Sequence, residues 1–283
     1  MQRSPARANP GRVAAAKACR AVEDGAFADE TPLPPGADGR LAWHLIQGML
    51  RHRAEVDASL QRCLKQPLDS LDAPVRSVLR LGAYEKMHGR APARAVVHQW
   101  VEVAKRVKAG RAHGLINAVL RRVEPVKQPT LEQRLNHPAW MVRRWMKRRG
   151  EAWTEARCAA NQQPARTCVV FHGTPPEGLE PAGPEGAYWF DGPLPAEGGW
   201  VMDPSAVEVA DRFAAAVGEG KVLDACASPG GKTLRLWSKG LEVVAADREA
   251  RLPRLKENLD RLGAGLHVKA RDWTRDQPTA TYQ

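Results

Sequence analysis

The sequence is poor in cysteine: it has five, irregularly spaced and without a C-x-x-C pair. This excludes a dense disulfide framework and a structural zinc site built from paired cysteines. We therefore expect a reducing, cytoplasmic setting and no bound metal. The sequence also lacks any run of 18 apolar residues, and its basic first 12 residues have no apolar core. We expect neither a membrane span nor a secretory signal.

Two common nucleotide-binding fingerprints are missing as well. There is no G-x-G-x-x-G run. Gly231, Lys232 and Thr233 match the second half of the Walker A pattern G-x-x-x-x-G-K-[ST], but Cys226 occupies the position of its first glycine. What is present, from Lys221 to Thr233, is an apolar strand, a Pro-Gly-Gly turn and the start of a helix. Glycine lets a ligand approach the backbone, and free amides at a helix start attract anionic groups. The segment predicts a nucleotide-like cofactor site in a methyltransferase variant of the doubly wound α/β fold.

Two acids follow this segment at the ends of predicted strands. Asp247 ends the apolar run 241–247, and Asp272 ends the run 266–272. An acid about 20 residues beyond the first loop of a doubly wound fold accepts hydrogen bonds from ribose hydroxyls, and a carboxylate at Asp272 could accept from an adenine amine. Each acid could equally be a turn residue. Lys232 could be a solvated lysine, and Cys226 is expected to be a small buried residue rather than a nucleophile.

Charge is unevenly distributed along the chain. Residues 1–150 hold 28 Lys and Arg against 13 Asp and Glu, whereas the remainder holds 15 against 19. The basic part is the candidate surface for a nucleic acid. Its apolar spacing predicts an all-helical bundle, with a break near Arg53. The expected helices span residues 12–23, 40–64, 72–82, 92–107 and 115–123, with Leu115 among the core residues and residues 1–10 as a disordered tail.

The connecting region has two distinctive parts. Trp140, Trp145 and Trp153 lie in a helical stretch, where we expect them to pack one helix against the next domain rather than to stack on bases. The basic cluster 143–149 beside them is a candidate RNA-backbone contact. Residues 167–172 favour a small strand. From 173 to 199, 13 of 27 residues are Gly or Pro. Such a stretch predicts turns and loops rather than a packed core.

The run from Asp224 to Thr233 resembles motif I of the RNA 5-methylcytosine methyltransferases of the Sun/Nop2 group, with Ser228 as a departure. Residues 199–206 resemble that group's entry segment, although Met202 and Val207 replace its two glutamines. The segments 76–84, 101–105 and 114–122 resemble a NusB-type RNA-binding domain, an arrangement found in the bacterial members that act on small-subunit ribosomal RNA. The resemblance implies S-adenosylmethionine as cofactor, contacted by Cys226, Ala227, Ser228, Pro229, Gly230, Gly231, Lys232, Asp247 and Asp272.

The resemblance also implies a multidomain fold. We expect an all-α NusB-like bundle over residues 1–130, a small mixed α/β linker over 131–204, and the first half of a Rossmann-like methyltransferase domain over 205–283. The implied function is methylation of cytosine C5 in 16S ribosomal RNA by a monomer. Two alternatives stay open: a non-catalytic NusB-type antitermination module and a P-loop nucleotide hydrolase.

Catalytic residues are not expected within this sequence. The family places its nucleophile in a Thr-Cys motif and a helper cysteine in a Pro-Cys motif, both beyond the third strand. Neither dipeptide follows Asp272, and the Thr167-Cys168 pair precedes the fold. We therefore expect a C-terminally truncated chain that cannot methylate RNA alone.

Overall fold

The computed structural model describes residues 8–28, 31–192 and 198–276. The chain divides into two compact units, Met1–Pro164 and Ala165–Gln283. The first is helical and the second is a partial α/β unit, so the predicted fold class is confirmed. Among the described residues, no helix has the length and apolar character required to span a membrane.

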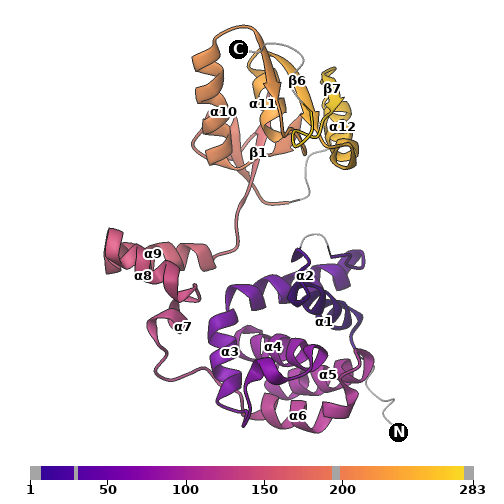
Figure 1. Ribbon diagram of the computed structural model, residues 1–283, viewed down its shortest axis with the longest axis vertical. Coiled ribbons are helices and arrows are strands. Elements are labelled where there is room, and N and C mark those ends of the chain that lie inside the picture. Colours follow the sequence, from indigo (N-terminus) through magenta and orange to yellow (C-terminus); the bar gives the residue numbers. More distant parts are fainter. Residues whose placement is uncertain (1–7, 29–30, 193–197, 277–283) are drawn as a thin grey trace. The chain divides into compact units, whose positions relative to one another are not determined.

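The first unit is a helical bundle built around one central helix. Helix α4 packs against five other helices of the bundle, and ten of its residues are buried. Gly48 permits the close approach of α2, because a Cβ there would lie 1.9 Å from the Tyr84 hydroxyl. The bundle helices, drawn in Figure 1, are α1 (Pro10–Glu23), α2 (Gly36–Arg51), α3 (Arg53–Gln61), α4 (Ala73–His88), α5 (Ala93–Arg106) and α6 (His113–Arg122), with short 3-10 turns η2 (Leu68–Ser70) and η3 (Gly110–Ala112).

The helical periodicity of the sequence locates this bundle well. The predicted break near Arg53 is confirmed, because α2 ends at Arg51 and α3 begins at Arg53. Helix α2 starts at Gly36, however, four residues before the predicted start. Leu115 is 40% exposed and is not a core residue, whereas Ile116 and Leu120 are fully buried. Of the predicted tail, residues 1–7 lie outside the described residues, and α1 already begins at Pro10.

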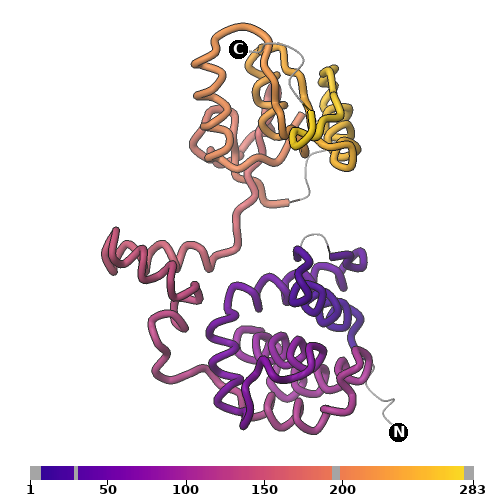
Figure 2. The backbone as a smooth tube through the Cα atoms, viewed as in Figure 1, coloured from indigo at the N-terminus to yellow at the C-terminus, as the bar shows by residue number. Residues whose placement is uncertain are grey.

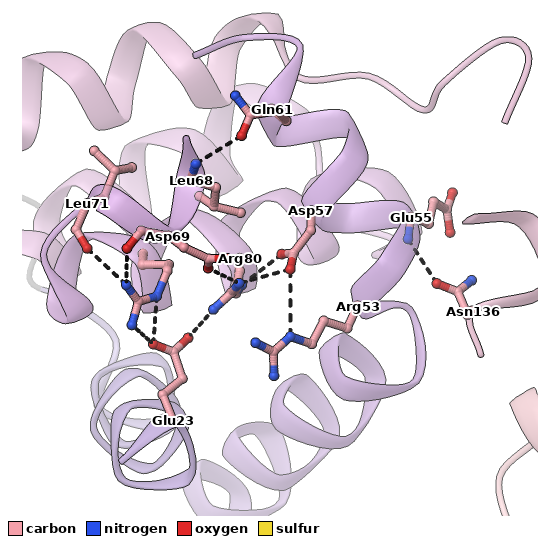
Figure 3. Close-up of polar contacts among 11 residues, drawn as sticks. Glu23, Arg53, Glu55, Asp57, Gln61, Leu68, Asp69, Leu71, Arg80 and Asn136 are labelled. Atoms are coloured by element: carbon pink, nitrogen blue, oxygen red, sulfur yellow. Dashed lines mark hydrogen bonds and ion pairs between the residues drawn. The ribbon is translucent and has the colours of Figure 1, made fainter. Parts of the chain in front are cut away.

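A buried arginine ties the bundle together. The guanidinium of Arg80 donates to Asp57 at 2.7 and 2.9 Å, to Glu23 at 2.6 Å and to Asp69 at 3.3 Å. Figure 3 shows it among these three carboxylates, which come from three different elements. Its side chain is 2% exposed. Because a buried charge is tolerated only when it is paired and hydrogen-bonded, this network fixes how α1, α3 and η2 meet α4.

Three further helices complete the first unit: α7 (Leu131–Leu135), α8 (Ala139–Arg149) and α9 (Glu151–Gln162). In Figure 2 the backbone of α8 turns back so that α9 runs beside it. Trp145 packs onto the small core of Leu135, Val142 and Cys158. The Trp153 ring lies edge-on to Trp145 with the ring centres 5.9 Å apart, whereas Trp140 is 59% exposed. The expected packing of these tryptophans against the next domain stays a prediction.

The second unit contains two sheets that share one core. An antiparallel sheet has the order β2-β3-β1-β4, and a parallel sheet has the order β5-β6-β7. Residues of both sheets, such as Val170 and Val243, belong to the same buried cluster. The strands are β1 (Thr167–Phe171), β2 (Glu180–Pro181), β3 (Ala187–Phe190), β4 (Gly199–Val201), β5 (Lys221–Asp224), β6 (Glu242–Asp247) and β7 (His267–Ala270); the helices are α10 (Pro204–Val217), α11 (Gly231–Ser238) and α12 (Leu252–Arg261), with a 3-10 turn η4 (Glu249–Arg251).

The Gly- and Pro-rich stretch is more structured than its composition predicts. It provides β2, β3 and the first residue of β4, and Ala187 in β3 is buried. Backbone pairing with β1 holds β3 in place despite the flanking glycines. The helices of residues 131–162 lie in the first unit and the strands from 167 onward lie in the second. The division at 130 and 204 stays a prediction.

Candidate cofactor site

The glycine turn predicted from sequence lies between β5 and α11. Gly230 has φ of 109°, a left-handed conformation that favours glycine. It is also the N-cap of α11, and no side chain caps this helix start. The first amides of α11 therefore remain available to a ligand. Gly231 begins the helix, Lys232 is exposed in its first turn, and Pro229 lies exposed on the turn before it.

Asp247 joins this turn to the neighbouring strand. It ends β6 and is 5% exposed, and its Oδ2 accepts the backbone N–H of Ser228 at 2.9 Å. Its Oδ1 accepts the N–H of Arg248 at 2.8 Å. The Ala227 N–H donates to the Ala246 carbonyl at 3.0 Å, which fixes the same turn against β6. Because each carboxylate oxygen can accept more than one hydrogen bond, both retain capacity for a ligand hydroxyl.

Asp272 lies two residues beyond β7, at the same carboxyl edge of the parallel sheet. The sheet register pairs Asp247 with Ala270 and Asp224 with Ala245. The carboxylate of Asp272 accepts from the backbone and hydroxyl of Thr274, and these bonds hold its pKa below the ordinary value. It therefore closes a local turn. The structure brings Ser228 and Asp247 into contact and places Asp272 at the end of the adjacent strand.

Three residues of this region were missed by sequence reasoning. Asp224, which ends β5, accepts from the Thr233 hydroxyl at 2.7 Å. Trp273 donates to the Ala225 carbonyl at 2.6 Å. Asn258 of α12 donates to the Pro229 carbonyl at 2.7 Å. An acid at the end of a strand is the signal that identified Asp247, and the same signal could have identified Asp224. No local sequence pattern marks Asn258 or Trp273.

The cysteines of the second unit have opposite environments. Cys226 is exposed, contrary to the expectation of a buried residue, because the chain leaves the sheet after Asp224. Cys168 lies within β1 and is 3% exposed, and burial raises the pKa of its thiol. A thiol held in its protonated form is a poor nucleophile. The Thr167-Cys168 pair is thus part of the core.

A basic surface occupies helix α8 of the first unit. Its exposed side chains line a hollow of about 540 Å³ and comprise Arg143, Arg144, Lys147 and Arg148. Beside it, the guanidinium groups of Arg149 and Arg157 lie 5.8 and 5.6 Å from the ring centre of Trp153. Exposed aromatic rings beside arginines are the groups on which unpaired bases stack.

Comparisons with known proteins agree with the two-part architecture. Residues 9–125 match the NusB family, and residues 214–281 match the family described as 16S rRNA methyltransferase RsmB/F. The ribosomal RNA small subunit methyltransferase B of Pseudomonas syringae pv. tomato is 33% identical, over 93% of this chain and 67% of that protein. Its counterpart from Thermus thermophilus is 35% identical, over 86% of this chain and 60% of that protein.

A solved structure shows the same fold. The crystal structure of PH0851 superposes with a TM-score of 0.65 at 17% identity, covering 96% of this chain and 70% of that one. The chain spans 60 to 67% of the length of the two curated relatives. The chain therefore belongs to the ribosomal RNA small subunit methyltransferase B family.

Proposed function

We propose that this protein takes part in the methylation of cytosine C5 in 16S ribosomal RNA, with S-adenosylmethionine as the methyl donor. In this proposal the second unit holds the cofactor and the first unit binds the RNA. The observation that carries it is the contact between Asp247 and the amide of Ser228, which joins the glycine turn to the end of the next strand. Names of relatives support RNA methylation.

The residues at this edge fit the cofactor chemically. Asp247 offers a carboxylate to the ribose hydroxyls, and the uncapped start of α11 offers amides to the carboxylate of the amino-acid part. Asp272 is proposed to accept from the adenine amine. The bound cofactor would supply an activated methyl group. The role of this chain is to hold it at a turn whose shape is fixed by Asp247, Asn258 and Trp273.

Calorimetric titration with S-adenosylmethionine tests this assignment. Asp247→Ala should weaken binding by about 1.5–3 kcal/mol, because it removes an acceptor of ribose hydroxyls and an anchor of the turn. Asp260→Ala is the matched control, because it removes the same side chain from an exposed position on α12 of the same unit. ATP should not replace the cofactor. Equal affinities for wild type and Asp247→Ala would remove Asp247 from the site.

We propose that the basic surface of α8 contacts RNA phosphates. Arg144→Ala/Arg148→Ala should weaken binding to a 16S RNA fragment and lower the slope of log affinity against log salt by about 1.4, at about 0.7 per single-strand phosphate contact. The charge-matched control Arg62→Ala/Lys65→Ala changes two exposed residues of the same unit. An identical salt slope in both variants would place the RNA elsewhere.

Methyl transfer in the proposed reaction requires a cysteine thiolate that adds to cytosine carbon-6, which makes carbon-5 nucleophilic toward the donor's methyl group. Carbon-5 would take this methyl group and leave the donor as S-adenosylhomocysteine. A base would then remove the carbon-5 proton, and breaking the carbon-6–sulfur bond would release the thiolate. Cys168 is buried in β1 and does not fit this role. We propose that residues 1–283 alone bind the cofactor weakly and transfer no methyl group. Detecting 5-methylcytosine in RNA incubated with purified residues 1–283 would overturn this.

A further inference from the structure

A cluster of two histidines and a glutamate lies in the first unit, and its residues belong to neither of the two proposed surfaces. His52 stands between α2 and α3, Glu55 lies in the first turn of α3, and His88 is the last residue of α4. Nδ1 of His52 is 3.3 Å and Nε2 of His88 is 3.2 Å from the same oxygen, Oε2 of Glu55. One ligand atom from each residue lies within 4.8 Å of the others.

The local structure explains why these three side chains meet. His52 and Glu55 are three residues apart on a helical turn, so they face the same side. Tyr84, one turn before His88, stacks on the His88 ring at 5.3 Å and lies 5.8 Å from the His52 ring. The Glu55 amide donates to Asn136 Oδ1 at 2.9 Å, a contact drawn in Figure 3. The cluster is therefore held by the bundle on one side and by the end of α7 on the other.

The distances are those of two ligands of a common metal ion. Two ligands each about 2.1 Å from a tetrahedral metal lie about 3.4 Å apart, close to the two contacts measured here.

The three side chains are partly open to solvent, and a cavity borders one of them, Glu55. The side chains of His52, Glu55 and His88 are 26%, 23% and 26% exposed. A cavity of about 150 Å³ borders Glu55, between α3 and the segment 126–134. Arg134 also lines this cavity, and its charge is paired with Glu155. Imidazole nitrogens together with a carboxylate oxygen are ligands typical of zinc.

We propose that His52, Glu55 and His88 bind one divalent transition-metal ion of the zinc type, with water completing a tetrahedral shell. The sequence expectation of no metal rested on cysteine spacing, whereas this site uses imidazole and carboxylate ligands. The ion would join the α2–α3 junction to the end of α4. Through Asn136, which accepts from the Glu55 amide, the site also connects to the end of α7.

The test uses residues 1–283 carrying Cys226→Ser, stripped of metal with a chelator and titrated with Zn²⁺ by calorimetry and with Co²⁺ by visible absorption. Cys226→Ser removes an exposed thiol as a competing ligand. One equivalent should bind. His52→Ala and His88→Ala should each weaken binding by about 100-fold or more, since changes outside the ligand shell alone cost about 10–100-fold. His98→Ala, an exposed histidine on α5, should bind like the parent.

A parent protein that binds neither ion more tightly than His88→Ala would overturn the proposal, and so would an equal loss in His98→Ala. Far-UV circular dichroism checks that each variant is folded. If a histidine variant fails to fold, X-ray absorption of the zinc-loaded parent protein decides the matter. Imidazole scattering with nitrogen and oxygen at about 2.0–2.1 Å is expected, and a sulfur shell or a fully aquated ion would exclude the site.

Discussion

Among the described residues, each of the two units buries one arginine, and the partners of the two arginines differ. Arg80 in the helical unit pairs with three carboxylates, of which Glu23 is itself only 7% exposed. Arg235 in the α/β unit pairs with one carboxylate, Asp211, which is 26% exposed, and donates at 2.9 Å to the backbone carbonyl of Glu185. The first arginine joins helix to helix. The second also holds a loop backbone.

The same contrast extends to other polar groups. In the helical unit, Glu85 accepts from the side chains of Arg12 and Trp100. In the α/β unit, Asp247 and Asn258 bond to backbone atoms of the glycine turn. Side-chain pairs between helices fix packing, whereas side chains bonded to a loop backbone fix the shape of a binding surface. The comparison indicates that the buried Arg80 and Glu85 of the first unit act on helix packing, whereas Asp247 and Asn258 of the second act on the shape of the site.

The largest expected effect is the loss of Arg80. Arg80→Ala removes four hydrogen bonds to three carboxylates and leaves the buried Glu23 with Arg76 as its remaining partner, so it should destabilise the helical unit by about 3–5 kcal/mol. Arg235→Ala should destabilise the α/β unit by only about 1.5–3 kcal/mol, because the partly exposed Asp211 regains water. Hydrogen exchange in increasing urea measures the opening free energy of peptides from each unit separately. Equal losses in the two variants would remove the distinction between the two arginines.

Two fully buried threonines, one in each unit, allow a comparison in which the expected loss of stability is smaller. Thr233→Val deletes a hydroxyl bonded to Asp224 at 2.7 Å and should destabilise the α/β unit by about 1.5–3 kcal/mol, as expected for bonds to charged groups. Thr154→Val deletes a bond to the Gly150 carbonyl, which still accepts the Thr154 amide, so about 0.5–1 kcal/mol is expected. The same exchange experiment measures both.

Cofactor titration adds a second measurement to the threonine pair. Only Thr233→Val should also weaken S-adenosylmethionine binding, because Asp224 and Thr233 flank the glycine turn. Thr154 lies in α9 of the other unit and should have no effect on affinity. A variant Thr233→Val with unchanged affinity would show that the shape of the turn does not depend on this hydrogen bond.

Periodic and strand-end patterns made much of the fold predictable. The spacing around Arg53 predicted two helices, and the apolar run ending at Asp247 predicted β6 and its place beside the glycine turn. These patterns succeed because burial of one face imposes a fixed period on the sequence. The strands β2 and β3 were not predictable in this way. Strand β3 is held by pairing with β1, and β2 by pairing with β3, rather than by their own propensity.

Contacts between distant segments account for the rest. The burial of Arg80, the exposure of Trp140 and the approach of His88 to Glu55 depend on which helices become neighbours. A spacing such as His52-x-x-Glu55 is common on helices, and only the fold brings His88 to it. The contact of Trp273 with Ala225 is similar, since the two residues are 48 positions apart.

The smallest effect concerns two helix starts, one in each unit. Asp203 caps α10 by accepting from the Ser205 amide at 2.8 Å, whereas Asp72 stands at the same position of α4 without a side-chain cap bond. Asp203→Ala should therefore cost about 1 kcal/mol. Asp72→Ala should cost clearly less, although both helices carry a proline in their first turn. Equal costs would mean that the cap bond contributes nothing.

The pH dependence of stability separates the contribution of the cap hydrogen bond from other effects of the Asp203 substitution. The hydroxyl and then the amide of Ser205 lower the Asp203 pKa. The unfolded chain therefore takes up a proton at higher pH than the folded one, so this contribution is fully present above the ordinary aspartate pKa. It is lost as the pH falls through the lowered value. The stability difference between wild type and Asp203→Ala, measured by hydrogen exchange of α10 peptides, should shrink over that range.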